Sequence, residues 1–207
     1  MNDQKQTLLA QAILYKTLSA GFAYPDAEMI AAWRDGSFAE TITDALTSLA
    51  IDDTPTNALT RTETDEPNLD EEYSFLFLRG GGVAPYESSY LNRNLASNNE
   101  LADVTGFYRA FGFEVAERAK ELPDHVAVEL EFLALLCAKE AYAIENDWHE
   151  QTEICAQARH DFIAQHLGLW LNQFGERAQK QARLGFYSAL AQIAARATQV
   201  SENVLAA

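Results

Sequence analysis

The chain is poor in cysteine and in long apolar runs, and each shortage argues against a class of protein. Cys137 and Cys155 are its only cysteines among 207 residues, and they form neither a Cys-x-x-Cys motif nor a zinc-type cluster. We expect both to be small apolar core residues in a reducing compartment. No apolar run approaches the roughly 20 residues that span a bilayer. Residues 1–6 are polar and do not form a secretory signal, so we expect a cytoplasmic protein.

The chain also has few basic residues. Lysine and arginine total 15 against 31 aspartate and glutamate residues, which gives a formal net charge of -16. Such an acidic surface repels phosphate, which argues against nucleic acid or an anionic membrane as a partner. A cationic partner would be attracted, and salt would weaken that attraction. Solubility alone explains the same excess of carboxylates equally well, so charge leaves both interpretations open.

Helical periodicity is what the sequence contains in abundance. Apolar side chains recur at helical spacing in the segments 8–22, 38–49, 69–77, 101–111, 123–146, 150–174 and 179–200. The segment 123–146 is apolar on two faces, which is typical of a central, buried helix. Nothing has the pattern of a set of strands, so the predicted fold class is all-α. With 48% hydrophobic residues, we expect a single domain, or two lobes that share a core.

One charged motif, Glu121-Leu122-Pro123-Asp124-His125, directly precedes the most apolar helix. Proline favours the first turn of a helix, so we expect Asp124 and His125 at an exposed N-terminal end. Glu129 follows His125 by four residues on the same helical face, a spacing that could hold a metal. The second histidine of a His-Glu-x-x-His motif is missing, which weakens that interpretation. A solvated helix start, with Asp124 complementing the helix dipole, explains the motif as well.

Other motifs that could carry chemistry are incomplete. Gly80-Gly81-Gly82 follows no strand and precedes no Gly-Lys-Ser/Thr, so a bend is expected there and not a phosphate loop. His149, His160 and His166 lack metal-ligand spacing and are expected to be structural or solvated. No serine lies in a Gly-x-Ser-x-Gly elbow, and neither cysteine has a recognisable catalytic partner. We therefore expect no catalytic residue, no metal and no cofactor.

Aromatic residues gather on both sides of the glycine run. Tyr73 and Phe77 precede it, and Pro85, Tyr86 and Tyr90 follow it in an extended loop that has no helical period and that we expect to be rich in exposed aromatics. Periodicity cannot assign aromatics in such a loop to a core. Tyrosine combines an apolar ring with a polar hydroxyl, which suits a peptide-binding groove. A core that anchors the loop is the alternative, and the chemistry leaves both open.

Several motifs, in order along most of the chain, resemble the TorD/DmsD-type redox-enzyme maturation chaperones and, more distantly, the NarJ-type nitrate reductase assembly proteins. They are residues 12–19, 72–77, 128–133, 166–170 and 186–190, together with Pro85-Tyr86-Glu87-Ser88-Ser89-Tyr90-Leu91, Phe107-Tyr108-Arg109-Ala110-Phe111-Gly112-Phe113 and Glu121-Leu122-Pro123-Asp124-His125. The resemblance implies a TorD-like helical bundle over 1–207, with lobes 1–120 and 124–207 joined by a hinge at 121–123. It also implies a non-enzymatic monomer or domain-swapped dimer.

Such chaperones bind the twin-arginine signal peptide and the folded part of a molybdopterin-containing oxidoreductase subunit, and they delay export until the cofactor is inserted. Two guanidinium groups joined to an apolar stretch need carboxylates beside an aromatic groove. Asp124 and Glu87 are the expected arginine acceptors, and His125 is expected to make affinity change between about pH 5 and 8. The family's peptide site maps here onto Tyr73, Leu76, Phe77, Pro85, Tyr86, Ser88 and Tyr90, with Asp124 and His125 at its edge.

The chain departs from the family pattern in two places. Members often carry Gly-Pro shortly after the Leu-Phe pair, where this chain has Leu78-Arg79-Gly80-Gly81-Gly82, and tryptophan is frequent where Tyr73 and Tyr86 stand. A different client is therefore expected. One alternative is an assembly factor for a non-exported, membrane-bound reductase. Another is a metal-assisted or acid–base enzyme that uses Asp124, His125 and Glu129. Guanine-nucleotide binding, attributed to some relatives, has no phosphate loop here to support it.

Overall fold

The structure is a computed structural model that describes residues 2–61, 68–78, 82–91, 97–115 and 121–205. These residues form helices and contain no sheet, only an isolated antiparallel bridge between Tyr86 and His125. The predicted all-α class is confirmed. In chain order the elements are α1 (Asn2–Phe22), α2 (Ala27–Asp35), α3 (Ser37–Ser48), η1 (Thr54–Leu59), α4 (Leu69–Tyr73), η2 (Ser74–Leu78), η3 (Glu87–Ser89), α5 (Ser97–Ala110), α6 (Val126–Glu145), α7 (His149–Phe162), η5 (Ile163–Leu167), α8 (Gly168–Gln181) and α9 (Gly185–Leu205).

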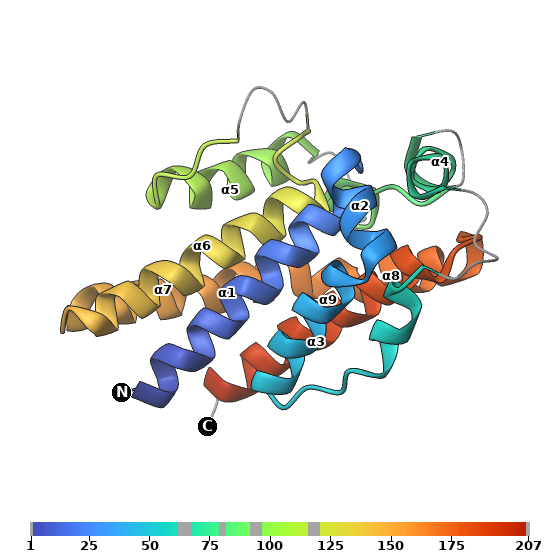
Figure 1. The fold of residues 1–207 in the computed structure, drawn as a ribbon. Coiled ribbons are helices and arrows are strands. Elements are labelled where there is room, and N and C mark those ends of the chain that lie inside the picture. The colour runs from blue at the N-terminus through green and yellow to red at the C-terminus, as the bar shows by residue number, and fades with distance from the viewer. Residues whose placement is uncertain (1, 62–67, 79–81, 92–96, 116–120, 206–207) are drawn as a thin grey trace.

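Helices α1 and α6 lie side by side along most of their lengths at the centre of the bundle (Figure 1). Leu130, Leu133 and Leu136 of α6 are fully buried, as expected for a helix that is apolar on two faces. Helix α7 packs against α6, and α8 packs against α9. One buried apolar cluster runs from α1 to α9. Because this core crosses the boundary at 121–123, the two lobes and their hinge stay a prediction.

Helix α6 begins later than the sequence predicts. Pro123 and Asp124 form a turn, and the helix starts at Val126 with His125 as its N-cap in extended conformation. Nδ1 of His125 accepts a hydrogen bond from the N–H of Ala127 at 3.1 Å. The imidazole therefore satisfies a free N–H of the first turn, a function more often served by a short polar side chain. Asp124 is left free to bond elsewhere.

The segment predicted as one helix over 150–174 is interrupted. The π-helical turn η5 separates α7 from α8, and the N–H of Gly168 donates to the carbonyl of Ile163, five residues earlier. The π-helical turn η2 likewise follows α4 directly. A π turn places one extra residue in a helical turn and often marks a functional site. Here η2 carries Phe77, and η5 carries His166, whose Nδ1 lies 3.1 Å from the carboxylate of Glu87 in the aromatic loop.

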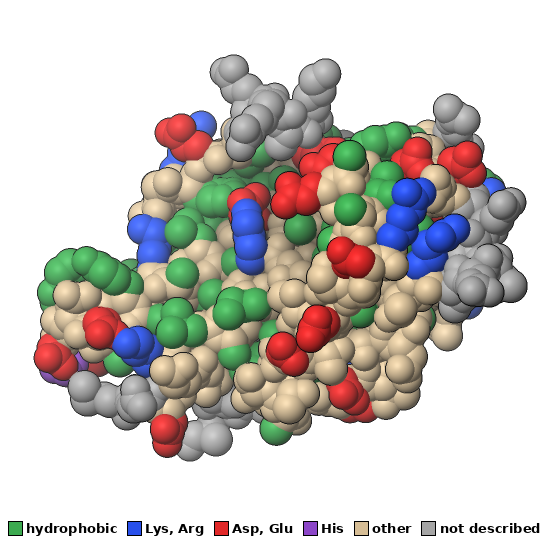
Figure 2. Space-filling view, viewed as in Figure 1, with side chains coloured by type: hydrophobic (Ala, Val, Ile, Leu, Met, Phe, Trp, Pro, Cys, Tyr) green, Lys and Arg blue, Asp and Glu red, His purple; other side chains and the backbone are tan. Residues whose placement is uncertain are grey.

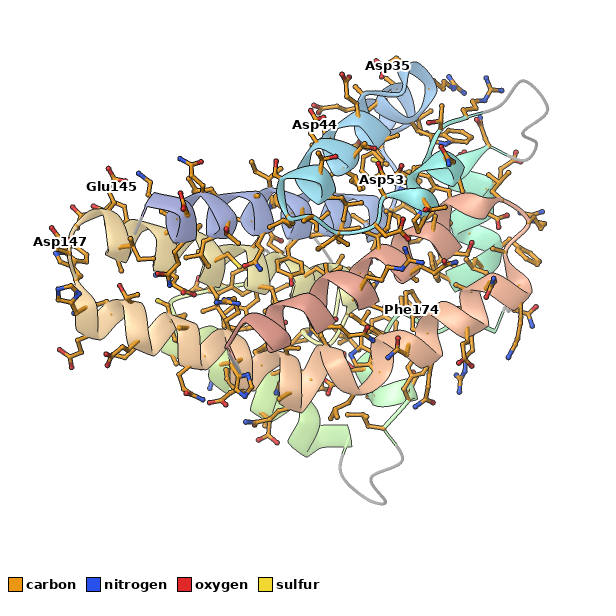
Figure 3. All side chains as sticks on the ribbon, turned by 90° about the horizontal axis from the view of Figure 1, so that it is seen from below. Asp35, Asp44, Asp53, Glu145, Asp147 and Phe174 are labelled. Carbon is orange, nitrogen blue, oxygen red and sulfur yellow. The ribbon has the colours of Figure 1, made fainter. Side chains whose placement is uncertain are left out.

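Most of the carboxylates lie on the outside of the bundle, and most of the aromatic side chains pack inside it. Figure 3 shows the labelled Asp35, Asp44, Asp53, Glu145 and Asp147 at the periphery, whereas Phe174 lies between helices. The excess of negative charge is thus largely a surface property. Within the described part of the chain, no helix is both long and apolar enough to cross a membrane.

Candidate functional site

The proline-containing aromatic loop is tied by its backbone to the turn before α6. The N–H of Glu87 donates to the carbonyl of Asp124 at 3.0 Å, and the N–H of Val126 donates to the carbonyl of Pro85 at 2.9 Å. The N–H of Ser88 donates to Oδ2 of Asp124 at 3.1 Å, across 36 residues of sequence. The fold therefore joins the two motifs that the resemblance assigns to one site.

Tyr86 stands half-buried at this junction. Its hydroxyl donates to Oε2 of Glu121 at 2.9 Å, and its ring meets that of His125 edge-on, with centroids 5.1 Å apart. Burial raises the pKa of Tyr86 to about 12, and the hydrogen bond to Glu121 adds to the shift. The Glu121 side chain retains 25% of its exposure, and its Oε2 lies 3.8 Å from Nε2 of His125. Glu121 is thus a carboxylate that solvent reaches beside an aromatic ring.

Tyr73, in α4, is almost fully buried. Its ring contacts those of Phe77 and Tyr24 edge-on, at centroid distances of 4.9 and 5.3 Å. Burial raises the pKa of Tyr73, and the electrostatic influence of Glu121, Tyr86 and Tyr24 adds to the shift. Tyr24 is 55% exposed. We use the name aromatic corner for Tyr24, Tyr73, Tyr86, Glu121 and His125.

The expectation that Asp124 and His125 stand at an exposed helix end is wrong. Asp124 is 0% exposed and His125 is 1% exposed, because the loop around Tyr86 lies across the end of α6. Burial lowers the pKa of His125 to about 4. The imidazole of the free protein is therefore neutral between about pH 5 and 8, which removes the basis for the expected change of affinity in that range.

Glu87, the other expected arginine acceptor, is also completely buried. Both of its carboxylate oxygens lie 3.1 Å from Nδ1 of His166. Glu129 is buried nearby, and its Oε2 accepts a hydrogen bond from Nε1 of Trp170 at 3.3 Å. Burial, together with the negative charges of Glu87 and Asp124, raises the pKa of Glu129 well above its ordinary value. We use the name buried acidic cluster for Glu87, Asp124, Glu129 and His166.

The remaining predicted site residues divide between core and surface. Leu76 and Pro85 are buried. Tyr90 is only 8% exposed, and its ring packs on Trp170 at 5.3 Å between centroids, so the prediction of exposed aromatics is wrong for Tyr90. Phe77 is partly buried and stacks on Phe174. A core that anchors the loop accounts for these residues, whereas Tyr86 retains a solvent-facing part.

Two residues of the corner were missed or given too little weight from the sequence. Sequence reasoning assigns no role in the site to Tyr24, which lies just beyond the end of α1. It assigns none to Glu121 beyond its place in the motif 121–125. The signal that could have found Tyr24 is its position in Tyr24-Pro25-Asp26, a break that leaves the ring free of helical periodicity. No pattern in the sequence indicates that Glu121, and not Asp124, stays accessible.

Among the described residues, no three or more His, Cys, Asp or Glu side chains are arranged to hold a metal ion. Cys137 and Cys155 are buried free thiols, as expected for apolar core residues. In the glycine run, Gly80 and Gly81 lie outside the described residues. Gly82 adopts a φ of +77°, a conformation that favours glycine and suits a bend.

Comparison with known proteins covers most of the chain. A sequence model of the family described as nitrate reductase delta subunit matches residues 35–176. The chaperone protein TorD of Vibrio cholerae is 32% identical over 151 residues, which cover 72% of this chain and 67% of the relative. The chlorate reductase assembly chaperone protein of Ideonella dechloratans is 31% identical over 182 residues, 86% of this chain and 82% of the relative. The selenate reductase assembly chaperone protein of Thauera selenatis is 36% identical over 114 residues, which cover 54% of this chain and 58% of the relative.

Proposed function

The chain belongs to the nitrate reductase delta subunit family, together with TorD-type chaperones, and from this premise we propose that it matures a molybdopterin-containing reductase before export. In this proposal the protein acts in the cytoplasm, binds the twin-arginine signal peptide of the catalytic subunit and holds the subunit until its cofactor is inserted. The relatives are named as the chaperone TorD and as assembly chaperones of chlorate reductase and selenate reductase, and not as catalysts. This agrees with the prediction that the protein is not an enzyme.

The observation that carries the signal-peptide proposal is the contact between Tyr86 and Glu121. A guanidinium group forms paired hydrogen bonds with a carboxylate and stacks on an aromatic face. Glu121 offers an accessible carboxylate 2.9 Å from the Tyr86 hydroxyl, and Tyr24 offers a second exposed ring nearby. Leu122, 52% exposed, adds apolar surface next to them.

Glu121 therefore replaces Asp124 and Glu87 as the proposed arginine acceptor. A buried carboxylate that is already hydrogen-bonded has little to offer a peptide, since the peptide would have to displace its partners. Asp124 and Glu87 are buried, and their hydrogen bonds hold the loop against the turn before α6. In this proposal they affect the peptide only by positioning the loop that carries Tyr86.

A second candidate function is assembly of a reductase that is not exported. The description of the matching family, nitrate reductase delta subunit, favours it. In this case the client would lack a twin-arginine signal. Purification of the chain with its client from the native cell separates the two functions by the presence or absence of that signal.

The binding site is tested with a synthetic peptide that carries two arginines followed by an apolar stretch. Glu121→Gln should lower affinity at low salt about tenfold, because it removes a charge-assisted hydrogen bond. Glu40→Gln is the matched control, an exposed glutamate on α3 that loses the same charge. Tyr86→Ala should also weaken binding. Unchanged affinity in both corner variants, or an equal loss in Glu40→Gln, contradicts the site while leaving the family assignment intact.

A further inference from the structure

A surface groove of about 720 Å³ lies between α5 and α7, and we use the name α5–α7 groove for it. On the α5 side its lining includes Phe107, whose partly buried ring meets those of Phe162 and His166, each at 5.4 Å between centroids. On the α7 side the lining includes Ile154, which is 50% exposed. Both helices therefore contribute apolar side chains to one open groove.

Gly106, which also lines the groove, has no structural explanation among the described residues. Its φ lies outside the left-handed region, and a Cβ at this position would have no atom of a neighbouring segment within 4 Å. Glycine weakens the interior of a helix relative to alanine, and Gly106 lies inside α5. Ala102 and Ala110, four residues before and after it, lie on the same face of the helix. This face of α5 is thus open to a close approach that no described residue makes.

The dimensions of the groove suit a short helix. Its lining extends from Ala102 to Ala110, about 12 Å along α5 at about 1.5 Å per residue, which is about two helical turns. Small side chains along that length allow the axis of another helix to come close. A helix with apolar residues at every third or fourth position would cover Ile154 and the partly buried Phe111 of the same lining.

The charge of the groove is negative. Among the described residues that line it, the charged ones are Asp103 and Asp161, and none is basic. Neither aspartate forms an ion pair within the described part of the chain, although Asp161 accepts a hydrogen bond from Nε2 of Gln157 at 2.8 Å. Two carboxylates without cations attract a basic partner. A second copy of the chain would bring another net charge of -16 and would be repelled.

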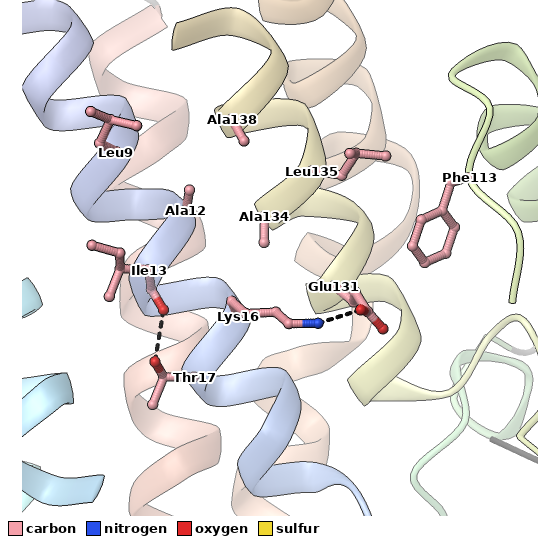
Figure 4. Close-up of a pocket in the computed structure, with 10 residues that line it drawn as sticks. All are labelled: Leu9, Ala12, Ile13, Lys16, Thr17, Phe113, Glu131, Ala134, Leu135 and Ala138. Carbon is pink, nitrogen blue, oxygen red and sulfur yellow. Dashed lines mark hydrogen bonds and ion pairs between the residues drawn. The ribbon is translucent and has the colours of Figure 1, made fainter. Parts of the chain in front are cut away.

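Another apolar groove, of about 640 Å³, lies between α1 and α6 (Figure 4). Figure 2 shows hydrophobic surface over these two helices. In that groove Lys16 and Glu131 form an ion pair, so its charges neutralise each other. Apolar surface is therefore common to both grooves, whereas carboxylates without a cation, together with an unexplained glycine, distinguish the α5–α7 groove. A basic helix should prefer the α5–α7 groove for this reason.

We propose that the α5–α7 groove binds an amphipathic helix of a folded partner protein, a helix that carries lysine or arginine beside its apolar face. The backbone of that helix lies against Gly106, and its apolar side chains cover Phe107 and Ile154. Its basic side chains pair with Asp103 and Asp161. This site is separate from the aromatic corner, and the proposal does not depend on a twin-arginine signal.

The test uses a synthetic helix of about 14 residues, roughly four turns, with leucines along one face and lysines beside them. A second helix has glutamate in place of every lysine. Fluorescence anisotropy at low salt should show the lysine helix bound at least about tenfold more tightly than the glutamate helix, with a smaller preference at high salt. Gly106→Leu should weaken the lysine helix about tenfold, because its side chain occupies the space of the close approach.

Two further variants have matched controls. Ile154→Ser should weaken the lysine helix about tenfold, and its control is Ile13→Ser in the groove between α1 and α6, since Ile154 is 50% and Ile13 is 52% exposed. Asp103→Asn should weaken it about threefold, because an exposed ion pair contributes little. Its control is Asp44→Asn, an exposed aspartate on α3 that loses the same charge.

The stability of Gly106→Ala tests the glycine separately. Because the added Cβ would enter open space, the urea midpoint of this variant should rise. A lower midpoint would mean that the fold itself needs the glycine, and it would overturn the proposal.

The binding outcomes are equally decisive. The proposal is supported if the three groove variants weaken the lysine helix and leave the affinity for the twin-arginine peptide unchanged. Equal binding of the two helices overturns it, and so does an equal loss in Ile13→Ser or Asp44→Asn. If Gly106→Leu changes only the dimer fraction measured by light scattering, the groove belongs to a second copy and the proposal is overturned. Failure of the twin-arginine peptide to bind would contradict the proposed function alone.

Discussion

Both carboxylate oxygens of Glu87 lie 3.1 Å from Nδ1 of His166, although 79 residues separate them in sequence and both side chains are buried. The contact ties the loop that carries Tyr86 to the π-helical turn before α8. Breaking one side of a buried polar pair leaves the other without a partner, which costs more than the pair contributes. The buried contact between Glu87 and His166 therefore helps to fix the position of Tyr86 at the surface.

Glu87→Ala should lower the free energy of unfolding by about 2 to 4 kcal/mol, because it leaves a cavity and an unpaired His166. Urea unfolding measures the loss. Glu87→Gln keeps the shape and one hydrogen-bonding oxygen, so its loss should be smaller. If Glu87→Gln reduced peptide affinity as much as Glu121→Gln while stability stayed unchanged, Glu87 would be an arginine acceptor after all.

His125 should make the protein sensitive to acid. Burial lowers its pKa from 6.5 to about 4, so below about pH 6.5 the unfolded chain binds a proton that the folded protein does not. The stability that depends on a neutral His125 is fully present above that pH. The free energy of unfolding then falls by about 2 to 3 kcal/mol as pH decreases towards 4. His125→Asn keeps an N-cap for α6 and does not titrate. Denaturant unfolding at about pH 7 and 4.5 should show a smaller drop in the variant. An identical drop in both proteins would contradict the assignment.

Glu129 should make the protein less stable as pH rises, the opposite of the effect of His125. Its pKa is raised by burial and by the charges of Glu87 and Asp124, so the folded protein keeps a proton that the unfolded chain releases as pH rises above about 4.5. Stability from this group is complete at low pH and decreases as pH increases. Glu129→Gln retains an oxygen for Trp170 and removes the titration. The variant should be more stable than the parent at about pH 8, with the advantage disappearing below about pH 4.5. A constant difference across the range would argue against the raised pKa.

Two glycines of α8 should respond oppositely to alanine. A Cβ at position 168 would lie 2.7 Å from the Ile163 carbonyl oxygen, whereas at 175 its nearest neighbour would be the Ala191 Cβ at 3.5 Å. Gly168→Ala should therefore lower the free energy of unfolding by about 1 to 3 kcal/mol. Gly175→Ala is the matched control, and it should be neutral or stabilising by up to about 1 kcal/mol, because glycine is a poor helix former. Equal effects would mean that η5 does not persist in solution.

Much of the fold could be predicted because helical periodicity is local. The apolar faces of the segment 123–146 predicted the central helix, and the lack of alternating patterns predicted the all-α class. The two π-helical turns gave no such signal, although one of them, η5, carries the His166 that contacts Glu87 in the loop around Tyr86. The hinge at 121–123 and its lobes stay predictions, since the core continues across them.

The sequence by itself determined the helices, the acidic surface and the motifs that meet at the start of α6. Only the tertiary structure decided which carboxylates a partner can reach. Asp124 and Glu87 are covered because distant segments fold over them, and Glu121 is left partly exposed beside Tyr86. The physical reason is that helical spacing assigns a side chain to a face, whereas its exposure depends on which remote segment packs on that face. Charge can thus be counted from the sequence, but its accessibility cannot.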